Sequence, residues 1–171
     1  ITYGNGAIIG GTKTLQLDIY RPDTPCNAAR PTVMFVHGGG FVGGSRRGGN
    51  VDAIATELAR RGINLISISY RLQGDNPVIG SEFVPFERDF QALNTSEPPA
   101  RVTAFTAAVE DATRALRWAS DNAATYCIDP QRFGVWGSSA GAFTVLHLAY
   151  SLDEYAIPRP PVRVAVDYWG G

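Results

Sequence analysis

The sequence contains few of the residues that define a cross-linked, metal-binding or membrane-spanning protein. Its 171 residues include two cysteines, too few for a disulfide scaffold or a zinc site. No apolar run approaches the length of a membrane span. Fifteen Lys and Arg residues stand against sixteen Asp and Glu, so the charge gives no bias towards nucleic acid or an anionic membrane. We therefore expect one ordinary globular unit with no metal and no nucleic-acid partner.

Strand-like patterns alternate with helical periodicity along the chain. The continuous run Thr32 to Val36 is typical of a strand covered on both faces, and residues 64–70 and 162–166 give similar predictions. Apolar residues recur at helical spacing over residues 52–61 and 105–119. This alternation predicts an α/β fold with a mostly parallel sheet and helices on both faces. Chemistry is then expected at the carboxyl ends of the strands.

The segment Gly137-Ser138-Ser139-Ala140-Gly141 fits G-x-S-x-G, with a short strand pattern before it and a helical pattern after it. In that context the pentapeptide indicates a nucleophile elbow, with Ser139 as the nucleophile. Gly137 and Gly141 leave room for the close approach of strand and helix. Ala140 begins the predicted helix, and its N–H points towards an oxygen bound above Ser139.

A second motif, His37-Gly38-Gly39-Gly40-Phe41, follows the strand at residues 32–36. Three glycines place bare backbone N–H groups where no Cβ blocks approach, which suits a site for a negative oxygen. With the N–H of Ala140 they could hold the oxyanion of a tetrahedral intermediate. The segment lacks G-x-G-x-x-G and G-K-[ST], so the sequence predicts no nucleotide and no other cofactor.

A polar, proline-bearing segment over about residues 73–101 is too long for an ordinary connection and contains Phe83, Phe86 and Phe90. We treat it as an insertion in the single domain 1–171. One interpretation is a lid or pocket wall beside the active site. The other is a surface excursion whose aromatic residues pack against the body of the domain.

Two further motifs complete a family pattern, namely Ser69-Tyr70-Arg71-Leu72 and Leu17-Asp18-Ile19-Tyr20-Arg21-Pro22. With these and the two glycine motifs, residues 15–171 resemble the α/β-hydrolase carboxylesterases and lipases of the hormone-sensitive-lipase-like type. The resemblance implies an α/β-hydrolase fold and a serine carboxylic-ester hydrolase that works through an acyl-enzyme. It implies Ser139 as nucleophile, the N–H groups of Gly39, Gly40 and Ala140 as oxyanion hole, and a small-molecule ester as substrate.

The sequence departs from this family in its catalytic acid and base. The family orders its triad as Ser, acid and His, with the last two well downstream of the elbow. His37 belongs to the glycine loop and His147 lies eight residues after Ser139 on the same predicted helix, so neither fits the base. Asp167 is a candidate acid, although a structural turn role is the stronger interpretation. We expect an incomplete hydrolase domain, with acid and histidine on a missing C-terminal segment or a second polypeptide.

The resemblance also bears on the cysteines and on alternative functions. Cys26 and Cys127 would lie at the amino ends of neighbouring strands, which favours a disulfide over two free thiols and a secreted or periplasmic protein over a cytoplasmic one. One alternative function is a non-catalytic binding module on the same fold. Another is a peptidase or formamidase. The pattern does not identify the ester.

Overall fold

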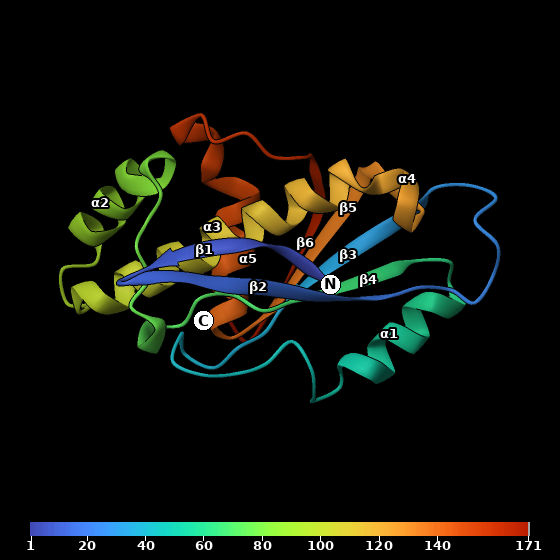
Figure 1. Ribbon diagram of the computed structural model, residues 1–171, viewed down its shortest axis with the longest axis horizontal. Coiled ribbons are helices and arrows are strands. Elements are labelled where there is room, and N and C mark those ends of the chain that lie inside the picture. Colours follow the sequence, from blue (N-terminus) through green and yellow to red (C-terminus); the bar gives the residue numbers. More distant parts are fainter. Residues whose placement is uncertain (171) are drawn as a thin grey trace.

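The computed structural model describes residues 1–170 and contains a six-stranded sheet with helices on both faces (Figure 1). The strand order is β1-β2-β4-β3-β5-β6. β1 and β2 pair antiparallel, as do β2 and β4, whereas β4, β3, β5 and β6 run parallel to one another. The predicted mostly parallel sheet is therefore confirmed. The strands are β1 (Thr2–Ile8), β2 (Gly11–Tyr20), β3 (Arg30–Val36), β4 (Asn64–Ile68), β5 (Ile128–Ser138) and β6 (Val162–Tyr168).

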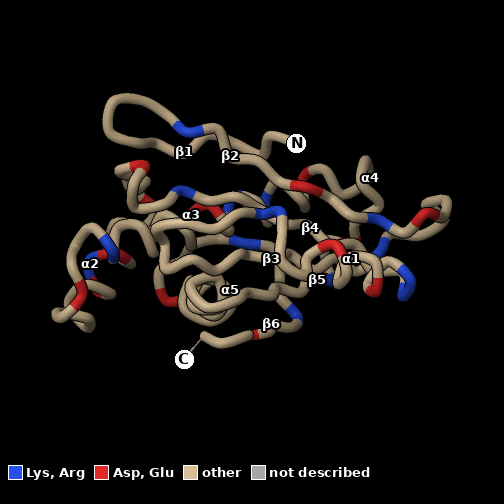
Figure 2. The backbone as a smooth tube through the Cα atoms, turned by 90° about the horizontal axis from the view of Figure 1, so that it is seen from below, with Lys and Arg blue, Asp and Glu red and all other residues tan. Residues whose placement is uncertain are grey.

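Helices cover the sheet unequally. α1 (Val51–Arg60) packs on one face, while α3 (Pro99–Asp121) and α5 (Ala140–Tyr150) pack on the other (Figure 1). α2 (Val84–Leu93) lies against α3, and the short α4 (Ala123–Tyr126) precedes β5. The N-terminus lies beside β1 and β2 and the C-terminal end beside β6, at opposite edges of the sheet (Figure 2). None of the helices in residues 1–170 combines the length and apolar composition needed to span a membrane.

Two hydrophobic clusters follow from this layering. The larger lies between the sheet and the pair α3 and α5, and the smaller lies under α1 around Phe35 and Leu65. α3 is buried along most of its length, and its contributions to the larger core cluster include the small residues Ala104, Ala108 and Ala112. Small side chains let the helix axis approach the strands closely, so α3 is a central element of the fold.

The segment over residues 73–101 is more regular than its polar composition indicates. It contains single 3₁₀ turns at Gln73–Asp75 and Ser81–Phe83, then α2, and α3 already begins at Pro99. Phe83 and Phe86 are buried in the larger core cluster, which explains how the segment stays attached. Two of its four prolines, Pro85 and Pro99, lie in the first turns of α2 and α3, where the missing N–H has no intrahelical partner.

A disulfide joins Cys26 to Cys127, which lie at the amino ends of the neighbouring strands β3 and β5. Their Cα atoms are 5.8 Å apart, within the normal range for a disulfide. The bridge closes a loop with a sequence separation of 101. In the chain-entropy model, closing a loop of this length lowers the conformational entropy of the unfolded chain and so stabilises the folded protein by about 4.7 kcal/mol. The predicted pairing is present.

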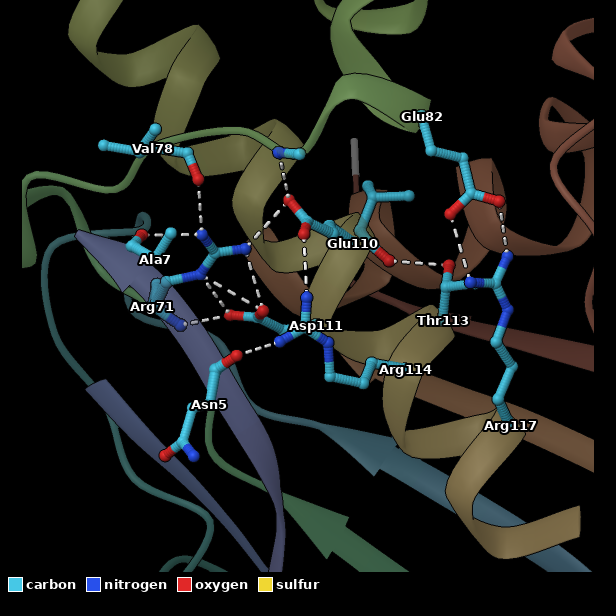
Figure 3. A network of polar contacts seen from close by, with 12 residues as sticks. Asn5, Ala7, Arg71, Val78, Glu82, Glu110, Asp111, Thr113, Arg114 and Arg117 are labelled. Atoms are coloured by element: carbon cyan, nitrogen blue, oxygen red, sulfur yellow. Dashed lines mark hydrogen bonds and ion pairs between the residues drawn. The ribbon is translucent and has the colours of Figure 1, made fainter. Parts of the chain in front are cut away.

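A buried charge network ties the segment after β4 to α3 (Figure 3). Arg71 and Asp111 are both fully buried, and Arg71 Nε and Nη2 donate to the Asp111 carboxylate at 2.9–3.1 Å. Arg71 Nη2 also lies 3.0 Å from Glu110 Oε2. Arg71 Nη1 donates to the backbone oxygens of Ala7 and Val78 at 2.9 and 2.8 Å. One guanidinium thus connects β1, the start of the 73–101 segment and α3.

Removing the carboxylate from this network should be far more damaging than removing an exposed one. Asp111→Ala leaves the buried Arg71 charge without its hydrogen-bonded carboxylate and with the ion pair to Glu110 alone, and the free energy of unfolding should fall by about 3–5 kcal/mol. Glu57→Ala, in the exposed Glu57–Arg61 pair of α1, is the control and should change it little. Urea unfolding followed by circular dichroism measures both. Equal losses in the two variants would contradict the assigned role of the network.

Candidate active site

Ser139 occupies a strained backbone conformation at the junction of β5 and α5. Its φ and ψ are 51° and −121°, a region that non-glycine residues rarely adopt. The Ser139 N–H donates to the carbonyl of Tyr168 in β6 at 2.9 Å, and the Ser139 carbonyl accepts from Ala142 at 2.8 Å as α5 begins. These bonds on both sides hold the turn in its strained form. The predicted sharp strand-to-helix turn is present.

The two flanking glycines are required by backbone contacts. A Cβ on Gly137 would collide with the backbone of Gly141, and a Cβ on Gly141 would collide with the carbonyl of Val36 at the end of β3. Backbone atoms in regular elements cannot move aside cheaply, so any larger residue would displace the elbow. The spacing of G-x-S-x-G therefore reflects the packing of β5, α5 and β3 at one point.

The glycine loop that follows β3 lies directly against the elbow. A Cβ on Gly38 would stand 3.2 Å from the Ser139 Cβ and 2.7 Å from the carbonyl oxygen of Ser138. Gly39 and Gly40 follow with φ of 120° and 60°, which suit glycine. The Gly39 carbonyl accepts from Val42 at 3.1 Å and closes the turn. Within residues 1–170, the N–H groups of Gly39 and Gly40 donate no hydrogen bond.

A pocket of about 330 Å³ opens beside this junction. Its lining includes Ser139, Gly40 and Ala140, three of the residues assigned to the site from the sequence. Ala140 is the first residue of α5, so its N–H has no acceptor within the helix. Two residues whose N–H groups have no acceptor, Gly40 and Ala140, therefore line the pocket together with Ser139. The remaining lining residues are Phe41, Phe90, Asn94, Glu97, Arg101, Val102, Phe105 and Phe143.

His37 is a structural part of the glycine loop. Its ring stacks on Tyr70 with centroids 4.3 Å apart, and its Nδ1 lies 2.7 Å from the Gly38 carbonyl. The Tyr70 hydroxyl in turn donates to the His37 carbonyl at 2.9 Å. Burial lowers the pKa of His37, so the ring is neutral at pH 7. These contacts fix the start of the loop.

His147 lies inside an aromatic cluster on the far side of the pocket wall. The rings of Phe86, Phe90 and Phe105 meet it edge-on, with centroids 5.1–5.7 Å away. Its Nδ1 lies 3.0 Å from the hydroxyl of Ser151. Burial lowers the pKa of His147. The histidine thus joins α5 to α2 and α3 through packing.

Asp167 lies on β6, in register with Gly137 and next to the elbow strand. Its carboxylate accepts a hydrogen bond from the N–H of Gly170 at 2.7 Å, as a turn residue does. Neither this carboxylate nor Ser139 bonds to a histidine within the described chain. Residues 1–170 also hold no cluster of three or more His, Cys, Asp or Glu side chains placed to bind a metal ion.

The sequence pattern does not reveal the polar part of the pocket wall. Asn94, Glu97 and Arg101 come from the end of the 73–101 segment and the first turn of α3. Phe90 precedes them on α2 and faces the same pocket. The pattern Glu97-Pro98-Pro99-Ala100-Arg101 indicates the start of a helix. It does not indicate which cavity the Glu and Arg side chains face. The aromatic residues of the segment were the better signal.

This geometry, a serine elbow against a glycine loop on a parallel sheet, defines an α/β-hydrolase of the carboxylesterase and lipase type. Lipase 1 of Geotrichum candidum is 29% identical over 154 residues, with 87% of this chain and 24% of the lipase covered. Phenmedipham hydrolase of Pseudarthrobacter oxydans is 32% identical over 139 residues, covering 79% and 23%. Native esterase 2 of Thermogutta terrifontis superposes with a TM-score of 0.64 at 21% identity, over 98% of this chain and 51% of that one.

Within this class, the sequence model of the family described as BD-FAE matches residues 17–81 and 82–159. The chain therefore belongs to the BD-FAE family. It spans about a quarter of the length of the first curated relatives that it matches. The resemblance to α/β-hydrolase carboxylesterases and lipases is confirmed, and so is the fold class that it implies.

The backbone contacts at the elbow predict that an alanine destabilises the protein more at Gly141 than at a glycine with open space around it. Gly141→Ala places a methyl group against the Val36 carbonyl and should lower the free energy of unfolding by about 1–3 kcal/mol. Gly11→Ala is the matched control, because a Cβ there meets no atom within 4 Å. Thermal unfolding of both proteins measures the difference. A melting temperature unchanged by Gly141→Ala would show that the helix start moves freely.

The buried histidine predicts sensitivity to acid. Because the folded-state pKa of His147 lies below its unfolded value, the unfolded chain takes up the proton first. Stability should therefore fall as pH drops from about 6.5 towards the folded-state pKa. His147→Gln should flatten this dependence without abolishing it, since His37 behaves alike. Urea midpoints at pH 7, 6 and 5 provide the measurement, and parallel pH profiles for the variant and the parent would contradict it.

Proposed function

We propose that this chain carries the nucleophile and the oxyanion hole of a serine carboxylic-ester hydrolase. The observation that supports it most is the position of Ser139, strained at the elbow, beside the pocket that Gly40 and Ala140 also line. Strained residues of this kind persist where the surrounding structure holds them, often at active sites. Family membership and the names of its relatives, lipases and esterases, support the same reaction class.

The proposed reaction is acyl transfer through Ser139. The Ser139 Oγ attacks the ester carbonyl carbon and gives its proton to a histidine base, while the carbonyl oxygen becomes an oxyanion. The N–H groups of Gly39, Gly40 and Ala140 donate to that oxyanion. The C–O bond to the alcohol then breaks and the alcohol leaves with the proton. Water attacks the acyl-enzyme by the same route, which releases the carboxylic acid and restores Ser139.

The histidine base and its acid are proposed to come from polypeptide outside residues 1–170. His37 and His147 are engaged with Tyr70 and with the aromatic cluster, away from the Ser139 hydroxyl. Asp167 caps a turn and remains the candidate acid in this part of the chain. A complementary C-terminal segment, on this or a second polypeptide, would complete the triad.

An apolar face on β6 supports such a complement. Val164, Val166 and Tyr168 alternate along the strand and are 53%, 46% and 55% exposed. Ala165, between them, packs on the larger core cluster, so the three exposed side chains point to the opposite face of the sheet. Large exposed apolar groups in one row mark a surface that binds further polypeptide.

Replacing the nucleophile tests the proposed function. Ser139→Ala in the enzyme that carries this chain should reduce kcat for 4-nitrophenyl acetate by at least about 10³-fold, because no oxygen is left to form the acyl-enzyme. Ser120→Ala, near the end of α3, is the control and should keep full activity. If the Ser139→Ala enzyme retained parental turnover, the serine mechanism would be wrong. An intact enzyme inert towards esters would favour a binding module.

A further inference from the structure

The pocket beside Ser139 combines an apolar body with one charged pair at its edge. Four phenylalanine rings line it, together with the backbone of the elbow and the glycine loop. Its polar side chains besides that of Ser139 are Asn94, Glu97 and Arg101. Because apolar pockets obtain their specificity from a few polar groups, we expect the charged pair Glu97 and Arg101 to determine which substrates the pocket selects. The inference that follows rests on the proposed esterase function.

Arg101 stands beside the glycine loop with unused hydrogen-bonding capacity. Its Nη2 lies 3.8 Å from the position of a Cβ on Gly40. Its Nη1 is 3.6 Å from Glu97 Oε2, too far for a hydrogen bond. Within residues 1–170 the guanidinium donates to no acceptor, whereas Arg114 and Arg117 of α3 each donate to a glutamate carboxylate. Arg101 is therefore free to donate to a bound molecule.

Glu97 presents the complementary acceptor. The Glu97 side chain is 43% exposed as a whole, but its Oε2 atom is shielded from solvent and accepts no hydrogen bond in the described chain. A carboxylate oxygen removed from water without a donor costs free energy, and a bound group that donates to it would recover part of that cost. Together Glu97 and Arg101 offer one acceptor and several donors with no net charge.

We propose that Glu97 and Arg101 select esters in which the group occupying this pocket ends in an uncharged hydroxyl. A hydroxyl accepts from the guanidinium and donates to the carboxylate at once, so it satisfies both. A methyl end leaves both unpaired, and sites with unpaired polar groups discriminate strongly against such analogues. A carboxylate end pairs with Arg101 but is repelled by Glu97. The pair determines specificity and does not act on the reacting bond.

The experiment compares matched esters on the enzyme that carries this chain. In the acyl series, kcat/KM is measured for ethyl hexanoate, ethyl 6-hydroxyhexanoate and monoethyl hexanedioate. In the alcohol series it is measured for hexyl acetate, 6-hydroxyhexyl acetate and 6-acetoxyhexanoate. In one series kcat/KM for the hydroxyl-terminated ester should be about tenfold higher than kcat/KM for the methyl-terminated ester, as expected for a hydrogen bond to a charged group. No preference for the hydroxyl in either series overturns the inference.

Variants assign the preference to the pair. Arg101→Met and Glu97→Gln should each bring the hydroxyl-to-methyl ratio close to one, and Glu97→Gln should raise kcat/KM for the carboxylate ester. Arg61→Met and Glu57→Gln are the controls, since this exposed pair on α1 has the same i,i+4 spacing. They should leave every ratio unchanged. A role confined to the start of α3 would lower the melting temperature of the Arg101 and Glu97 variants and leave the ratios intact, which overturns the inference.

A binding measurement separates this inference from the proposed function. The Ser139→Ala enzyme is titrated with the hydroxyl-terminated and methyl-terminated esters of each series and followed by NMR. Tighter binding of the hydroxyl-terminated ester in one series, lost in Arg101→Met, supports the selectivity of the pocket even if no ester is turned over. Equal binding of the two esters in both series overturns it, whatever the enzyme does to 4-nitrophenyl acetate.

Discussion

The close approach of three backbone segments at the elbow is the constraint on which the rest of this structure depends. β5, α5 and the end of β3 meet with no room for a side chain at Gly137 or Gly141, and Ser139 takes a strained conformation between them. Strain of this size needs support from the surrounding fold. The parallel strands on either side of β5 supply it, because β3 leads into the glycine loop and β6 binds the Ser139 N–H.

A second constraint positions the pocket wall. The segment after β4 must leave the sheet, pass β1 and turn back to α3, and the buried Arg71 guanidinium contacts all three. Phe86 then anchors α2 in the core, and Arg101 enters at the start of α3. The nucleophile and the wall that faces it are thus held by different interactions. Packing of backbone holds the first, and a charge network with an aromatic cluster holds the second.

Much of this fold could be predicted from local pattern. Apolar runs predicted β3 and β6, and the short strand pattern before the elbow motif predicted β5. The elbow motif itself predicted the turn at Ser139. The structure of the 73–101 segment is harder to predict, because its prolines indicate a loop although Pro85 and Pro99 lie in the first turns of helices. The environment of His147 could not be predicted either, since the aromatic residues around it come from α2 and α3, which tertiary packing brings against α5. The pairing of Glu97 with the pocket depends likewise on where α3 starts.

The Cys26–Cys127 bridge has a consequence for the covalent integrity of the molecule. It closes a ring that contains β3, α1, β4, α2, α3 and α4. β1 and β2 form a tail on one side, and β5, α5 and β6 form a tail on the other. A protease that cuts one exposed bond in the pocket wall therefore opens the ring without releasing a fragment. Both halves stay linked through sulfur, so the serine and the glycine loop remain parts of one molecule after the cut. Under reducing conditions the same single cut would divide the active site between two separate peptides.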